Sequence, residues 1–285
     1  MDVIRASAMG MCFGVLDALE VARTSDAPEE TTVFGELVHN EAVLSELEAR
    51  GFESLDEVER EGALDRIRTK RVLVTAHGIA DRERERLVRR GHELIDTTCP
   101  LVRRAHAAAL ALEREGRHVI VLGRMGHVEV RGLVGDLESF TIVQTEDDVS
   151  DFGFAALGIV CQTTLLEERM RGLIASIELA NPHADIVIRD TICEPTKERQ
   201  RALRDLISRV EAIVVVGGAH SNNTQQLVTT CRAAGRVALR VASADELDFE
   251  LLANYDTVGL TAGTSTPEST IDAVEAALRS SRVHC

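Results

Sequence analysis

Three cysteines occupy matching places along the chain and are the residues best suited to chemistry. Cys12, Cys99 and Cys193 each lie where an apolar run gives way to a helix-like stretch, at spacings of 87 residues (99 − 12) and 94 residues (193 − 99). Simple zinc loops draw their cysteines from one short motif, whereas one cysteine in each third indicates three similar units converging on one centre. Three thiolates around such a centre leave one position open.

The local contexts of these cysteines favour reactive or ligating thiolates. In DTTCPLV and DTICEPT, Asp-Thr stands before Cys99 and near Cys193, and proline follows within two residues. This pattern predicts a tight turn into a helix, whose N-terminal dipole favours a thiolate. A lone cysteine is usually a small buried hydrophobe. We apply that interpretation to Cys161, Cys231 and Cys285, which lack the shared context.

The donor set favours an iron–sulfur cluster over zinc. A structural zinc site takes a fourth protein ligand and often uses closely spaced pairs such as C-x-x-C, and the sequence contains no such pair. Thiolate-rich sites favour iron–sulfur clusters, and a [4Fe-4S] cluster with three protein thiolates keeps one iron open to a substrate oxygen. Such a cluster would act as a catalyst as well as an electron store. A structural zinc site is the alternative.

A second group of residues is polar and suited to an anion. Histidine, serine and asparagine side chains and backbone N–H groups at helix starts bind phosphate. The candidates come from GELVHN, TAHG, GHVEV, AHSNNT and TAGTSTPE: His39, His77, His127, Ser221, Asn223 and Ser265. Each could equally be a helix cap, and Ser265 with Glu268 resembles a capping box. The two interpretations are compatible, because both use the helix N-terminus.

An acid accompanies these groups. Glu129 stands two residues after His127, at what we expect to be a strand end, and it could deliver a proton if a dry site raises its pKa. Thr163 and Thr164 follow another strand and could position that carboxyl or a bound hydroxyl. An exposed glutamate and a Thr-Thr helix cap are the alternatives.

The elements that must position these residues alternate between short β-rich runs and longer amphipathic stretches. Examples are 72–75, 119–122, 159–161, 186–188, 213–216 and 258–261. This alternation predicts an α/β protein with mainly parallel sheets, in which ligands bind beyond the carboxyl ends of the strands. We expect three similar α/β units, at 1–99, 100–189 and 190–285, with the first strand joining the third unit.

Composition excludes several classes of partner. The formal charge of −15 and the 3% aromatic content argue against nucleic-acid binding, which needs basic residues or stacking platforms. No apolar stretch approaches the roughly 20 residues that span a bilayer, so we expect no membrane insertion. The N-terminus lacks the features of a signal peptide, and the six cysteines lack the density of a disulfide scaffold. We therefore place the protein in the cytoplasm.

Together, the motifs resemble a known family across nearly the whole chain. GMCFGV, LVHN, AHG, DTTCPLV, GHVEV, CQTT, DTICEPTKERQ, SNN and TAGTSTPE occur in the order found in the IspH/LytB family, the 4-hydroxy-3-methylbut-2-enyl diphosphate reductases. The resemblance implies a trefoil of three α/β units around a central [4Fe-4S] cluster held by Cys12, Cys99 and Cys193. It also implies reductive dehydroxylation of the substrate to isopentenyl and dimethylallyl diphosphates in the methylerythritol phosphate pathway.

The resemblance also implies roles for the polar residues. Glu129 would supply a proton with help from Thr163 and His127. The diphosphate would be held by His39, His77, Ser221, Asn223 and Ser265, and His127 and Thr164 would line the same pocket. An external electron donor such as ferredoxin or flavodoxin is implied, and no G-x-G-x-x-G dinucleotide fingerprint appears at a strand–helix turn. Candidate arginines for docking this donor are Arg82, Arg84, Arg86, Arg89, Arg90, Arg103 and Arg104.

Three positions depart from the family pattern. Asn222 stands where the family commonly has a second serine, Val128 replaces a proline, and Arg131 replaces a glutamate. We expect Arg131 to lower the pKa of Glu129 if the two are within reach. These departures keep two alternatives open: a paralogue acting on a related small phosphorylated substrate, and an iron–sulfur sensor without turnover.

Overall fold

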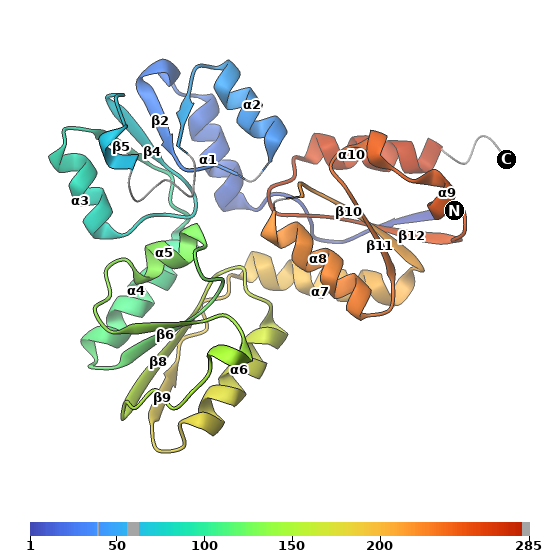
Figure 1. Ribbon diagram of the computed structural model, residues 1–285. Coiled ribbons are helices and arrows are strands. Elements are labelled where there is room, and N and C mark those ends of the chain that lie inside the picture. Colours follow the sequence, from blue (N-terminus) through green and yellow to red (C-terminus); the bar gives the residue numbers. More distant parts are fainter. Residues whose placement is uncertain (39, 56–62, 220, 281–285) are drawn as a thin grey trace. The chain divides into compact units, whose positions relative to one another are not determined.

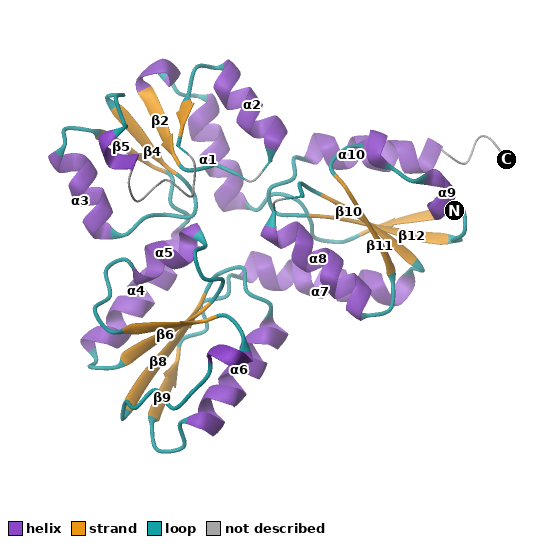
Figure 2. Ribbon diagram, viewed as in Figure 1, coloured by secondary structure: helices purple, strands orange, loops and turns teal. Residues whose placement is uncertain are grey.

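The computed structural model describes residues 1–38, 40–55, 63–219 and 221–280, and it contains three four-stranded sheets (Figures 1 and 2). All pairings between neighbouring strands are parallel. The expectation of an α/β fold built from three parallel-sheet units is therefore confirmed.

The first sheet along the chain has the order β3-β2-β4-β5. Its strands are β2 (Thr31–Phe34), β3 (Glu53–Ser54), β4 (Arg71–Val74) and β5 (Glu93–Asp96), and its helices are α2 (Glu41–Ala49) and α3 (Asp81–Arg89). The two central strands, β2 and β4, are largely buried, as parallel strands covered on both faces must be, whereas the edge strand β3 is exposed. Leu87 of α3 packs against Phe34, Val72 and Val74 in this core.

The second sheet repeats this arrangement with the order β7-β6-β8-β9. Its strands are β6 (His118–Leu122), β7 (Phe140–Val143), β8 (Ala156–Cys161) and β9 (Asp185–Ile188). The helices are α4 (Pro100–Arg114), α5 (Val128–Val134) and α6 (Glu167–Ala180). Ala105, Ala109 and Leu112 of α4 pack with Val130 and Leu133 of α5.

The third sheet takes its fourth strand from the start of the chain. It combines β10 (Ala212–Val216), β11 (Val237–Val241) and β12 (Thr257–Ala262) with β1 (Asp2–Arg5), and β1 pairs with β12. Its helices are α7 (Glu194–Arg209), α8 (Asn222–Ala233), α9 (Phe249–Leu252) and α10 (Glu268–Ser280). Ile271, Val274 and Leu278 of α10 pack on buried valines of this sheet.

Helix α1 (Phe13–Arg23) follows β1, and short 3-10 helices complete the described secondary structure, at Pro28–Glu30, Ala63–Asp65, Glu146–Asp148 and Ala244–Glu246. The chain divides into two compact units. The first comprises Met1–Leu16, Val38–Glu46 and Glu198–Cys285, and the second comprises Asp17–Leu37 and Leu47–Lys197. The second unit holds both the first and the second sheet. The proposed boundaries after residues 99 and 189 stay predictions.

The three sheets share one strand order, and each functional cysteine follows the same strand of its sheet. Read from the edge, the orders are β3-β2-β4-β5, β7-β6-β8-β9 and β11-β10-β12-β1. Cys99 follows β5, Cys193 follows β9 and Cys12 follows β1, which is the corresponding edge strand in each sheet. The near-even spacing of the cysteines thus reflects a structural repeat.

Among the described residues, no helix is both long enough and apolar enough to cross a lipid bilayer.

Candidate functional site

Each of the three cysteines stands directly before a helix. Cys12 precedes α1 (Phe13–Arg23), Cys99 is the N-cap of α4, and Cys193 precedes α7. This confirms the predicted turn from a strand into a helix. All three are partly exposed and unpaired by disulfides. A thiolate at a helix N-terminus is stabilised by the helix dipole, so these positions suit ligating sulfur.

The other described cysteines are fully buried, and burial raises their pKa values. Cys161 ends β8 and Cys231 lies inside α8, and both are fully buried. Burial raises the pKa of Cys161 to about 12 and that of Cys231 to about 11. Both therefore remain protonated thiols, as a structural role requires. Cys285 lies outside the described residues. The donor set of three partly exposed, soft sulfur ligands fits an iron–sulfur cluster.

Glu129 is buried in the first turn of α5, which differs from the expected strand end. Only 2% of the residue is exposed, and Thr163 contacts both carboxyl oxygens. The Thr163 backbone N–H donates to Oε1 at 2.6 Å, and its hydroxyl donates to Oε2 at 3.0 Å. Burial raises the pKa of Glu129 to about 7, although the two bonds from Thr163 oppose that rise. Glu129 is thus an acid suited to proton transfer near neutral pH.

Arg131 was expected to lower this pKa if it lay within reach, but burial and the two bonds from Thr163 are the influences on the pKa of Glu129, and Arg131 is not among them. Arg131 lies in the last turn of α5 and lines a groove together with Arg82 and Arg86.

Two histidines adjoin the acid. His127 is the N-cap of α5, and its Nδ1 accepts the Glu129 backbone N–H at 3.1 Å. In the neutral ring the proton is therefore on Nε2, which makes that atom a donor. The ring of His77 meets the ring of His127 edge-on, with the centroids 5.7 Å apart. A cavity of about 210 Å³ is lined by His77, Glu129 and Thr98 among other residues.

Backbone hydrogen bonds connect this acid cluster to two of the cysteines. The Cys193 N–H donates to the Thr163 carbonyl at 3.0 Å, and the Cys99 N–H donates to the Ala76 carbonyl, beside His77, at 3.0 Å. The second compact unit therefore brings together Cys99, Cys193, His77, His127, Glu129 and Thr163. Thr164 lies next to Thr163, and its hydroxyl accepts a bond from Gln162 at 3.1 Å.

A separate polar group lies at the carboxyl ends of β10 and β12 in the first compact unit. Ser221 is the N-cap of α8, and its hydroxyl accepts the Thr224 N–H at 3.3 Å and a bond from the Ser265 hydroxyl at 3.4 Å. The Asn223 carbonyl oxygen accepts the Thr264 N–H at 3.0 Å. The predicted anion-binding residues Ser221, Asn223 and Ser265 are thus neighbours at one helix N-terminus.

Glycines allow the loops of this group to approach closely. A Cβ at Gly217 or at Gly263 would lie 2.2 Å from Thr224 Oγ1, and Gly217 has a φ of 155°. Thr224 is fully buried, and its Oγ1 has no hydrogen-bond partner among the residues that the structure describes. His39 and the side chain of Asn222 fall outside the described part, so their predicted roles stay predictions.

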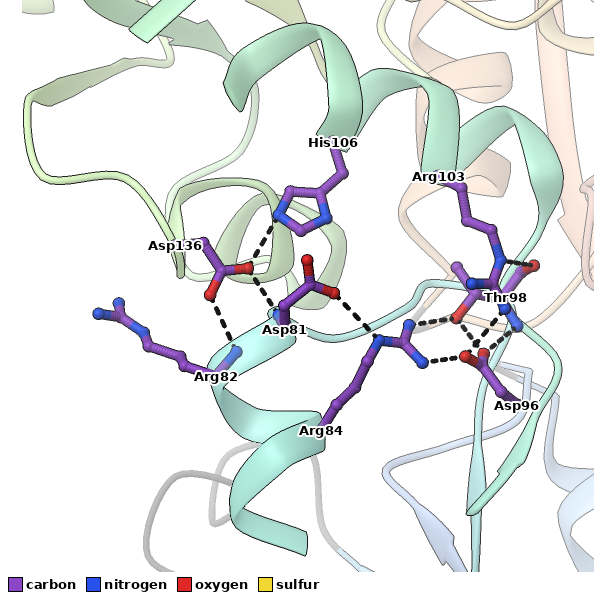
Figure 3. Close-up of polar contacts among 8 residues, drawn as sticks. All are labelled: Asp81, Arg82, Arg84, Asp96, Thr98, Arg103, His106 and Asp136. Atoms are coloured by element: carbon purple, nitrogen blue, oxygen red, sulfur yellow. Dashed lines mark hydrogen bonds and ion pairs between the residues drawn. The ribbon is translucent and has the colours of Figure 1, made fainter. Parts of the chain in front are cut away.

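Sequence reasoning missed the polar network that holds the Cys99 turn. Asp96 accepts the backbone N–H of Thr98 at 3.0 Å and its hydroxyl at 2.6 Å, and it pairs with Arg84 and Arg103 (Figure 3). The sequence signal for this network is the Asp-Thr pair that precedes both Cys99 and Cys193. An aspartate in that place can accept the backbone N–H of the residue two positions after it, which shapes the turn.

A second part of that network fixes the start of α3. Asp136 accepts the backbone N–H groups of Asp81 and Arg82 at 2.6 and 3.0 Å, and His106 Nε2 lies 3.0 Å from its Oδ2 (Figure 3). Asp81, His106 and Asp136 are close enough to hold a metal ion. Because Asp136 serves as the cap of α3 with both oxygens, we assign this cluster a structural role.

Comparison with known proteins extends the match over the whole chain. The family model described as "LytB protein" matches residues 3–279. The 4-hydroxy-3-methylbut-2-enyl diphosphate reductase of Caldanaerobacter subterraneus subsp. tengcongensis is 32% identical over 96% of this chain and 95% of the relative. The enzyme of that name from Burkholderia pseudomallei is 36% identical, covering 98% of this chain and 90% of the relative.

Solved structures agree with this match. The E-1-hydroxy-2-methyl-but-2-enyl-4-diphosphate reductase from Plasmodium falciparum superposes with a TM-score of 0.85 at 27% identity, covering 95% of this chain and 86% of that one. A solved (E)-4-hydroxy-3-methyl-but-2-enyl diphosphate reductase gives a TM-score of 0.70 at 30% identity, covering 98% and 100%. On these matches, the chain belongs to the LytB family, the iron–sulfur oxidoreductases of isoprenoid biosynthesis.

Proposed function

We propose that this chain is a 4-hydroxy-3-methylbut-2-enyl diphosphate reductase. In the reaction, two electrons and two protons convert the substrate to isopentenyl or dimethylallyl diphosphate and water, with cleavage of the allylic C–O bond. The observation that carries this proposal is the buried acid Glu129, which Thr163 holds with two hydrogen bonds while the Thr163 carbonyl binds the Cys193 N–H. Thr163 therefore connects an acid with a pKa of about 7 to the turn that carries Cys193.

Cys12, Cys99 and Cys193 would hold a [4Fe-4S] cluster with three thiolates and one open iron. When bound, the cluster supplies electrons and a Lewis-acidic iron for the substrate hydroxyl. Their position before helices α1, α4 and α7 supports this assignment. Cysteines that form no disulfide also favour a reducing, cytoplasmic location.

The polar group at the start of α8 would bind the diphosphate. Ser221, Asn223 and Ser265 offer hydroxyl and amide donors beside helix N–H groups, and the first turn of α8 contains no acidic residue. An anion is favoured there by the helix dipole. His39, His77, His127, Asn222 and Thr164 complete the proposed set of diphosphate-binding residues.

Glu129 would protonate the departing hydroxyl. Hydroxide is a poor leaving group, so the C–O bond breaks more easily when a proton is delivered as it breaks. The Thr163 bonds hold the carboxyl in one orientation, and the His127 ring is locked by its bond to the Glu129 backbone. Burial keeps water away from the acid, which maintains its raised pKa.

The experiment that tests this function is turnover by anaerobically purified protein. The protein is supplied with 4-hydroxy-3-methylbut-2-enyl diphosphate and a reduced viologen, and the isoprenyl diphosphates are quantified. We expect turnover in the wild type and in Cys231→Ser, a matched control whose cysteine lies inside α8, and none in Cys99→Ser. An intact cluster without turnover would point instead to a paralogue or a sensor.

The groove beside the acid cluster would dock an acidic electron carrier such as ferredoxin or flavodoxin. It measures about 330 Å³ and is lined by Arg82, Arg86 and Arg131, with Glu83 as its one acidic residue. Arg82 and Arg86 form no side-chain ion pair among the described residues, whereas Arg84, Arg89, Arg90 and Arg103 pair with carboxylates. In a chain of charge −15, such a local basic surface lets an acidic partner approach.

The groove also lies next to a cysteine turn. Gly78 and Ile79 line both the groove and the cavity that His77 and Glu129 also line. In the same loop, the Ala76 carbonyl accepts the Cys99 N–H. We expect Arg82→Gln with Arg86→Gln to raise the KM for a reduced acidic carrier several-fold and to leave the rate with a small viologen unchanged. Arg89→Gln, on the same helix and paired with Glu85, is the control. Equal KM values in both variants would exclude this groove as the docking site.

A further inference from the structure

Each of the three cysteine turns is held by a cationic side chain from a helix. At Cys99 this side chain is Arg103 of α4, whose Nη2 lies 2.8 Å from Asp96 Oδ2 and whose Nε donates to the Thr98 carbonyl at 3.4 Å (Figure 3). Arg84 of α3 also pairs with Asp96, and it donates to the Thr98 hydroxyl at 3.1 Å. The turn is therefore fixed from two helices at once.

The Cys193 turn is built in the same way. Asp190 accepts the Ile192 backbone N–H at 3.1 Å, as Asp96 accepts that of Thr98 at 3.0 Å. Lys197 Nζ then donates to the other Asp190 oxygen at 2.6 Å. In both turns the aspartate stands three residues before the cysteine and the cation four residues after it. The repeated spacing shows one design: an aspartate that shapes the turn and a helical cation that holds the aspartate.

The Cys12 turn is also held by a helical cation, but without an aspartate. Met9 stands three residues before Cys12, so no carboxylate is available at that place. Arg199 of α7 instead donates directly to the backbone, to the Gly10 carbonyl at 3.0 and 3.1 Å and to the Met11 carbonyl at 3.1 Å. A guanidinium can bind two carbonyl oxygens with its planar array of N–H groups, which fixes the chain just before the cysteine.

We propose that Arg103, Lys197 and Arg199 are positioning residues for the iron–sulfur cluster, and that their charges also favour its reduced state. This inference rests on the proposed function. Groups that hold the ligands of a metal centre control how firmly the metal is bound. Reduction by the external carrier adds one electron to the cluster, and a nearby positive charge stabilises the added negative charge.

The more deeply buried a cation is, the larger the effect we expect its loss to have on the cluster. The Lys197 side chain is 16% exposed and that of Arg103 is 51% exposed. Water screens the exposed charge more strongly, and Arg84 still pairs with Asp96 when Arg103 is lost. Lys197 should therefore have the larger effect on the cluster.

The test compares Lys197→Gln and Arg103→Gln with Arg104→Gln, which removes an exposed charge from the neighbouring position on α4. The readouts are the rate of iron loss to a chelator and the reduction potential from an anaerobic titration. We expect iron loss to be about 10- to 100-fold faster in Lys197→Gln, with a smaller increase in Arg103→Gln and none in Arg104→Gln. The potential of Lys197→Gln should shift to more negative values.

A conservative variant separates charge from folding. Lys197→Arg keeps the cation, so we expect it to retain the wild-type potential even if iron is lost somewhat faster. The inference is overturned if Lys197→Gln matches Arg104→Gln in both readouts, or if Lys197→Arg shifts the potential as far as Lys197→Gln does. A wild-type protein that binds no cluster would overturn the proposed function itself, so the two failures are distinguishable.

Discussion

Replacing Glu129 with glutamine separates the acidity of this residue from its hydrogen bonds. A glutamine side chain has the same shape, its oxygen can accept the Thr163 N–H, and its amide can donate to the Thr163 hydroxyl. The two contacts seen at 2.6 and 3.0 Å can therefore persist. The change removes the transferable proton and the buried charge.

The raised pKa predicts a specific effect on stability. In the folded protein the pKa of Glu129 is about 7, against an ordinary value of 4.5 that we take for the unfolded chain. As pH rises through this window, the unfolded chain releases its proton first, so the free energy of unfolding falls. The full loss, reached above pH 7, is about 3 kcal/mol. The free energy of unfolding of Glu129→Gln does not fall in this way, because glutamine does not ionise. The variant should therefore be more stable than the wild type by up to about 3 kcal/mol at pH 8, and this difference should be absent at pH 4.

The effect on catalysis has the opposite sign. Loss of a general acid slows a reaction by about 10²- to 10⁴-fold. In the wild type only the protonated form of Glu129 can deliver a proton, so the rate should fall above pH 7, with about a tenth of the acid form left at pH 8. The variant should be slow at every pH and show no such fall.

The assay measures viologen-driven turnover between pH 6 and 8.5, and denaturant unfolding is measured at pH 4 and at pH 8. Cluster absorbance serves as the control, because Glu129→Gln leaves all three cysteines in place. Our assignment is refuted if the variant keeps the wild-type rate. A gain in stability at pH 8 without a loss of rate would show that Glu129 is a buried carboxyl with no part in catalysis.

Three further changes test other parts of the site. Thr163→Val removes a hydroxyl that lowers the pKa of Glu129, so the fall in rate should move to higher pH, and an unmoved pH–rate profile would contradict this. Ser221→Ala removes the N-cap of α8; we expect a raised KM for substrate and a loss of about 1 kcal/mol in the free energy of unfolding, and an unchanged KM would count against the diphosphate site. Gly263→Ala places a Cβ 2.2 Å from Thr224 Oγ1, so the melting temperature should fall. Gly172→Ala is the control: its Cβ meets nothing within 4 Å, and because alanine favours the interior of α6 the melting temperature should rise slightly.

Much of the architecture follows from patterns local to the sequence. Short apolar runs such as 119–122 and 213–216 form buried parallel strands because such strands are covered on both faces. The cysteine turns were predictable because proline within two residues of Cys99 and Cys193 allows a helix to begin there. The Thr163 contact with Glu129 follows from both residues standing just beyond adjacent strands, β6 and β8.

Features that depend on long-range packing were not predictable in this way. Glu129 was expected at a strand end, but it lies in the first turn of α5, where its burial rather than a neighbouring charge sets its pKa. The arginines of 82–90 look alike in sequence, yet the fold pairs Arg84 and Arg90 with carboxylates and leaves Arg82 and Arg86 to line a groove. The contact of Arg199 with Gly10 spans 189 residues and carries no local signal.

We propose that three thiolates hold a cluster whose fourth iron is open to the substrate hydroxyl. A Mössbauer spectrum of anaerobic ⁵⁷Fe-loaded protein, recorded with and without 4-hydroxy-3-methylbut-2-enyl diphosphate, tests it most directly. We expect the signal of one iron to change on addition of substrate, while the other irons keep their sulfur-ligated signals. A spectrum that substrate leaves unchanged, with intact cluster and bound substrate in the same sample, would contradict it.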